Sequence, residues 1–145
     1  MVRGRRGLGA VLALALSSCG SAPDVGPSQP RPPGEARSFS ALTQEIIVPR
    51  CATSSCHAGS PPAAFPQLDA EIAWAAMVGV PSEQVPVLSM VEPYDPASSY
   101  LVLKLRGNAA DAGGVATPMP IGDAALEESD IAAIEAWIAG GAPND

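Results

Sequence analysis

One short stretch, residues 51–57, restricts most strongly what this chain can fold around. It reads Cys-Ala-Thr-Ser-Ser-Cys-His and places two cysteines, separated by four residues, directly before the only histidine in 145 residues. Two thiols and an imidazole this close together can form a disulfide beside a histidine, bind a metal ion, or hold a cofactor. The remainder of the chain has to be consistent with one of these three outcomes.

The first 19 residues are typical of a secretory signal peptide. Three arginines give a positive start, and residues 8–16 form an uncharged apolar run. This run is too short for a transmembrane helix, which needs about 20 apolar residues. Two serines and Cys19 follow at the expected cleavage site. Because the cysteines of an exported protein do not stay free thiols by default, the pair Cys51 and Cys56 is expected to be chemically engaged.

Residues 16–19, Leu-Ser-Ser-Cys, resemble the lipobox of bacterial lipoproteins. In that family the cysteine becomes the first mature residue and carries the acyl chains, so the resemblance implies lipidation of Cys19 and a membrane anchor on the periplasmic side. Gly20 follows instead of aspartate, which by analogy favours the outer membrane over the inner one. The alternative is an ordinary signal peptide with an incidental cysteine.

The mature chain is strongly acidic. Cleavage removes three of the eight basic residues and leaves all fifteen acidic ones, so the formal charge becomes −10. Such a surface is unsuited to nucleic acid or to an anionic membrane face. It would suit a basic partner protein that is steered electrostatically, although plain solubility explains it equally well.

Residues 20–37 contain five prolines and three glycines and cannot bury an apolar face. We expect them to form a disordered tether between the anchor and the folded part. Residues 38–145 are then one small domain. This domain has few aromatic side chains and many prolines, so its apolar core is thin, and a large apolar cofactor would supply buried surface.

Apolar spacing predicts an all-α domain with long irregular loops. The expected helices are residues 38–48, 70–78, 97–106 and 127–139. Ser40, Asp69 and Asp95 are candidate starts of the first three, and Pro49 is the expected end of the first. No alternating run is long enough for a strand. Long loops are expected where they wrap a cofactor.

Two thiols followed at once by a histidine are typical of covalent haem attachment, for which the usual form is C-x-x-C-H. On this interpretation Cys51 and Cys56 bind the two vinyl groups of one haem c, and His57 is the proximal iron ligand. The loop between the cysteines is two residues longer than usual and must bulge. Ser54 and Ser55 are small enough to allow this.

Methionine is the expected sixth ligand, because the chain has no second histidine and His/Met ligation is a known haem arrangement that raises the potential. Met119 lies between Pro118 and Pro120, which fix the backbone around it and lower the entropy cost of holding the thioether. Met90 is the alternative. Met77 has the spacing of a core residue in a helix.

From residue 43 to the C-terminus the chain resembles a small bacterial c-type cytochrome domain. The matching pieces are the first helix, Cys51/Cys56/His57, residues 95–101, Pro118-Met119-Pro120 and residues 134–142. The resemblance implies a helical shell whose first and last helices cross beside the haem. It also implies one-electron transfer without enzymatic turnover, with redox partner proteins docking near an exposed haem edge.

Two other interpretations remain open at the level of sequence, and a third, an enzyme, is not expected. A disulfide between Cys51 and Cys56 would make a tethered structural or binding module without haem. A zinc site would need a fourth ligand from Asp or Glu, because structural zinc is four-coordinate. An enzyme is not expected, because the carboxylates are scattered on helix faces and His57 is the only imidazole.

Overall fold

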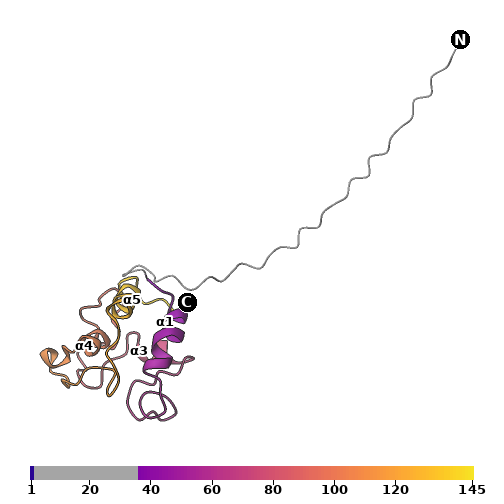
Figure 1. Ribbon diagram of the computed structural model, residues 1–145. Helices are drawn as coiled ribbons and strands as arrows, with labels where there is room; N and C mark the ends of the chain where they lie inside the picture. Colours follow the sequence, from indigo (N-terminus) through magenta and orange to yellow (C-terminus); the bar gives the residue numbers. More distant parts are fainter. Residues whose placement is uncertain (2–35) are drawn as a thin grey trace. The chain divides into compact units, whose positions relative to one another are not determined.

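The computed structural model describes Met1 and residues 36–145 (Figure 1). The predicted lipidation site, Cys19, lies outside the described residues, as do nearly all of the signal peptide of residues 1–19 and most of the tether of residues 20–37. Within the described part, no helix is both long and apolar enough to span a bilayer.

Short helices joined by irregular segments make up the described part. In chain order the elements are α1 (Phe39–Leu42), η1 (Thr43–Ile47), α2 (Val48–Arg50), α3 (Ala73–Met77), α4 (Tyr100–Arg106), η2 (Ala109–Ala112) and α5 (Glu128–Ala139). Residues 36–145 contain only two isolated β-bridges, Val78 with Val91 and Pro81 with Ser89. The predicted all-α class with long irregular loops is therefore confirmed for these residues.

The first helix starts at Phe39, within one residue of the predicted range 38–48, but its cap lies two residues before the predicted cap, Ser40. Ser38 has an extended backbone, and its hydroxyl accepts the N–H of Ala41 at 3.2 Å, so Ser38 is the N-cap and Ser40 lies inside α1. Phe39 is thereby helical and buried, with its ring centroid 5.2 Å from that of Trp137. The earlier start allows α1 to pack against α5.

Pro49 does not end this helix, in contrast to the prediction. The helix continues to Arg50, but the turn before the proline, η1, is a wider π-helix. A proline lacks the N–H of the regular ladder, and its ring collides with the carbonyl four residues earlier, so a wider turn lets the chain pass. The carbonyl of Ile47 then accepts the N–H groups of Cys51 at 2.8 Å and of Ala52 at 3.0 Å. The helix therefore delivers Cys51 directly at its end.

The core lies where the first helix, α3, α4 and α5 meet. Its most deeply buried large side chains are Leu42, Ile46, Met77, Val91, Trp137 and Ile138. Met77 is 1% exposed, as expected of a core residue. The indole N–H groups of Trp74 and Trp137 donate to the carbonyls of Ala142 and Pro143, each at 2.9 Å, and fix the C-terminal residues against the core.

The prediction for α5 is accurate within one residue, whereas α4 begins three residues later than expected, at Tyr100. The hydroxyl of Ser99 donates to the carbonyl of Asp95 at 2.9 Å and accepts the N–H of Glu92 at 2.9 Å. These contacts make Asp95-Pro96 the start of a separate turn. Gly107, with a φ of 76°, ends α4 as a left-handed cap.

Arg106 joins α4 to α5. Its guanidinium donates to both carboxylate oxygens of Glu128, at 2.7 and 2.9 Å, and to both oxygens of Glu135, at 2.8 and 2.9 Å. Paired hydrogen bonds of this kind fix orientation as well as distance. They hold the pKa of Glu128 below its ordinary value.

We expect this contact to make stability depend on acid pH. The pKa of Glu128 is lower in the folded chain than in the unfolded chain, so its contribution is present above about pH 4.5 and is lost as the pH falls through the folded pKa. Denaturation midpoints measured across this range should fall less steeply for Glu128→Gln than for the unaltered protein. Glu83→Gln, which removes an equal charge from an exposed position, should leave the slope unchanged; equal slopes for both variants would contradict the prediction.

Candidate functional site

Cys51 is the C-cap of the first helix and directly follows Arg50. Its side chain is half-buried against the main core, and its thiol is free. Burial raises the pKa of Cys51 to about 11, because a thiolate is poorly solvated there, although the nearby Arg50 opposes the shift. Cys51 is therefore a protonated thiol at neutral pH.

The four residues between the cysteines form a hydrogen-bonded turn, which is how the predicted bulge is accommodated. The N–H of Thr53 donates to the carbonyl of Cys51 at 2.9 Å. The carbonyl of Thr53 accepts from Cys56 at 2.9 Å and from Ala58 at 3.0 Å. The Cys56 thiol is also free, and hydrogen bonds from the hydroxyls of Thr53 and Ser55 lower its pKa.

His57 is held by the loop that follows it. Its Nδ1 lies 2.8 Å from the carbonyl oxygen of Pro66. Because a carbonyl only accepts hydrogen bonds, Nδ1 carries the proton, and Nε2 of the neutral ring keeps its lone pair for another partner. The carbonyl of His57 also accepts the N–H of Leu68 at 2.7 Å, so backbone and ring are fixed by the same segment.

Asp69 stabilises this loop and does not cap α3. Its carboxylate accepts the N–H of Gly59 at 3.0 Å and the amide of Gln67 at 2.6 Å. The helix begins later, at Ala73, and the carbonyl of Asp69 accepts the Ala73 N–H. Asp69 thus fixes both ends of the segment that carries the partner of the histidine ring. The sequence predicted Asp69 as the cap of the second helix, although its place at the end of a Gly/Pro-rich loop indicated a role in that loop.

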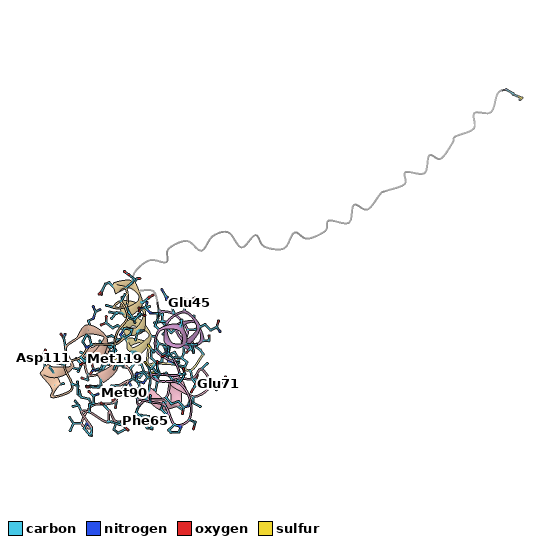
Figure 2. The ribbon with its side chains drawn as sticks, turned by 60° about the horizontal axis from the view of Figure 1, so that its bottom comes forward. Glu45, Phe65, Glu71, Met90, Asp111 and Met119 are labelled. Atoms are coloured by element: carbon cyan, nitrogen blue, oxygen red, sulfur yellow. The ribbon has the colours of Figure 1, made fainter. Side chains whose placement is uncertain are left out.

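Cys51 and the two candidate methionines lie at the rim of one core. Met90 and Met119 are both half-buried and pack against the same buried cluster as Cys51, and Figure 2 shows them in the central part of the domain. The N–H of Met90 donates to Val80 at 2.7 Å, and that of Met119 donates to Lys104 at 3.1 Å. Main-chain hydrogen bonds therefore hold both methionines in place, and these contacts do not distinguish Met119 from Met90 as the predicted sixth ligand.

No metal-ion cluster forms among the described residues, since nowhere do three His, Cys, Asp or Glu side chains converge. Cys51, Cys56 and His57 therefore do not form a joint three-ligand site. Zinc would require them to converge.

Two large apolar side chains are uncovered beside the candidate ligand loops. Phe65 is 62% exposed and directly precedes Pro66, the partner of His57 (Figure 2). Ile121 is 61% exposed and lies two residues after Met119. Two small cavities, of about 150 and 210 Å³, lie elsewhere, beside α1 and the C-terminus, and no predicted site residue lines them.

The two thiols should react at different rates. A pKa about two units above the ordinary value lowers the thiolate fraction of Cys51 roughly 100-fold, whereas hydrogen bonds favour the thiolate of Cys56. In the reduced, haem-free protein, an alkylating reagent at about pH 8 should label Cys56 first, as peptide mass spectrometry would show. The difference between the labelling rates of the two cysteines should become smaller as the pH approaches 11, because Cys51 then ionises as well.

Thr53→Val tests the cause of this difference. It removes one of the two hydroxyls that hydrogen-bond the Cys56 thiol, so labelling of Cys56 should slow while labelling of Cys51 stays unchanged. Equal labelling rates for the two cysteines in the unaltered protein would show that their surroundings do not differ in this way.

Comparison with known proteins gives no relative for this chain: no family model, no curated protein and no solved structure matches it.

Proposed function

We propose that this chain is a lipid-anchored protein of the periplasmic side that carries single electrons on one covalently attached haem. Residues 38–145 would form a small cytochrome c-like helical domain. The observation that carries the proposal is the hydrogen bond from His57 Nδ1 to the carbonyl of Pro66, next to the paired thiols. The proposal accounts for both the histidine and the cysteines.

The contact with Pro66 prepares His57 to bind a metal through Nε2. Histidine ligands commonly donate their other ring N–H to a carbonyl or carboxylate, which fixes the tautomer and orientation and raises the basicity of the ligating nitrogen. A module held by a Cys51–Cys56 disulfide would have no use for an imidazole fixed in this way. The geometry of His57 thus favours haem over the disulfide alternative.

Cys51 and Cys56 would make the two covalent attachments. Each thiol would add across one vinyl group, with the sulfur bonding to one vinyl carbon and the thiol hydrogen ending on the other. Cys51 is placed by the end of the first helix, and Cys56 by the turn through Thr53. The bound haem would supply reversible one-electron iron chemistry.

Met119 is the proposed sixth ligand. Pro118 and Pro120 restrict its backbone, and its N–H is bound to the end of α4. With His57 and Met119 both bound to the iron, no position would remain for a substrate, which supports electron transfer and not enzymatic turnover. Phe65 and Ile121 offer exposed apolar side chains that a haem face could cover.

The charges of the domain favour a basic redox partner. Arg37 and Arg106 pair with carboxylates of α5, and Arg50 pairs with Asp123. Lys104 is buried. The cations of residues 36–145 are thus already engaged, while acidic side chains such as Glu71 and Asp111 lie at the outline of the domain (Figure 2). We propose partners with a basic docking surface, and no nucleic acid.

Expression together with a c-haem maturation system tests the central proposal. The purified protein should keep its Soret absorbance after denaturation and extraction, because thioether bonds survive unfolding. Cys51→Ser/Cys56→Ser should lose that absorbance, because no thioether can form. A colourless unaltered protein without free thiols at Cys51 and Cys56 would instead establish the disulfide module.

The sixth ligand is tested by a matched pair of variants. Met119→Ala should abolish the weak red sulfur-to-iron band of the oxidised protein and lower its reduction potential, since thioether ligation raises the potential. Met90→Ala removes a thioether from the rim of the same core and should keep the band. The reverse result would assign the ligand to Met90.

The anchor depends on Cys19. Cys19→Ala should shift the protein from the membrane fraction to the soluble periplasmic fraction, because acyl chains can no longer be attached. Immunoblots of fractionated cells would measure this, with Cys51→Ala as a control that keeps the lipobox. An unchanged distribution of the Cys19 variant would exclude lipidation as the cause of membrane association.

A further inference from the structure

Lys104, the only lysine of the chain, is buried. It lies in α4 and is 5% exposed. Within the described part it forms no ion pair; its ammonium donates to the carbonyl of Val115 at 3.1 Å and to that of Thr117. Burial lowers its pKa, since a charged group in such a place is poorly solvated. A cation kept in this environment needs a structural reason.

The backbone of the same residue holds Met119. The carbonyl of Lys104 accepts the Met119 N–H at 3.1 Å. Lys104 therefore binds the irregular segment at three alternate residues, Val115, Thr117 and Met119, twice through its side chain and once through its main chain. The segment is laid along α4 by this one residue.

Few other contacts hold the segment. Among the described residues, the other hydrogen-bonding contacts of residues 115–120 are made by the N–H of Val115, which donates to the side-chain oxygen of Gln84 at 3.1 Å and also interacts with the Tyr100 hydroxyl. The same oxygen accepts the hydroxyl of Tyr100, which also lies in α4. Met119 itself is half-buried against the main core. Its position thus depends on Lys104 more than on any other polar contact.

We propose that Lys104 is a positioning residue for Met119: its buried ammonium holds residues 115–117 so that the thioether stays at the rim of the core. The inference rests on the proposed role of Met119 as the sixth haem ligand. A neutral thioether is a weak donor, so its binding depends on how little conformational freedom remains to be lost when it binds. Fixing the loop beforehand lowers that loss.

Lys104→Met tests the inference, because it keeps an unbranched apolar chain and the backbone carbonyl but removes the ammonium. Arg106→Met is the matched control: it removes the same charge from the same helix, but from contacts with α5. In the haem-free protein, exchange of the amide hydrogens of residues 115–117 and of Met119 should be at least about 10-fold faster in Lys104→Met and unchanged in Arg106→Met. Unchanged exchange in Lys104→Met would overturn the inference.

A measurement on the unaltered protein covers the case in which Lys104→Met fails to fold. With lysine labelled by ¹⁵N at Nζ, the sequence gives a single side-chain ammonium signal. We expect slow exchange of its protons with water and contacts to the protons of residues 115–117. A signal that exchanges as fast as free lysine would overturn the inference.

The haem-loaded protein separates this inference from the proposed function. Lys104→Met should weaken the red sulfur-to-iron band and lower the reduction potential, and Arg106→Met should change neither. If the unaltered protein binds no haem, the proposed function fails, while the exchange experiment still decides whether Lys104 holds the loop. If haem binds and Lys104→Met keeps the full band despite fast exchange, the loop contact does not serve the ligand, and the inference is overturned.

Discussion

Side-chain N–H groups that donate to main-chain carbonyls hold the irregular segments of this domain in place. Such pairs include His57 with Pro66, Trp74 with Ala142, Arg50 with Ala124, Lys104 with Val115 and Thr117, and Trp137 with Pro143. Buried carbonyls need partners, and loops outside helices and sheets cannot find them in a regular ladder. The helices are short and the core is thin, so the N–H groups of a few large side chains supply these partners.

Hydrophobic spacing was sufficient to predict the helices that depend on burial. The last helix was placed within one residue, because Ile131, Ile134 and Trp137 define one buried face. The caps of the earlier helices were misplaced, because a cap is chosen by tertiary packing among several suitable residues. Ser38 caps in place of Ser40 because this start buries Phe39 against Trp137.

The candidate site was predictable in its residue types but not in its supports. Two cysteines and a single histidine stand out in any reading of the sequence, and the prolines around Met119 distinguish it from other methionines. The acceptor for His57 is a main-chain carbonyl, which carries no signal of residue type. Lys104 did have a signal, since it is the one lysine of the chain and lies four residues after the buried Tyr100 in an apolar helix.

The cationic side chains that stabilise the fold also determine which surface charge a partner would meet. Arg37 and Arg106 neutralise carboxylates that would otherwise repel one another around α5, and Arg50 ties the segment after Met119 to the end of the first helix. Lys104 points its charge inward to two carbonyls. Because its positive groups bind carboxylates and carbonyls within the domain, the surface is dominated by the remaining carboxylates. An acidic surface is therefore a consequence of how the fold is stabilised, and the proposed basic partner would need no dedicated binding residue to recognise it.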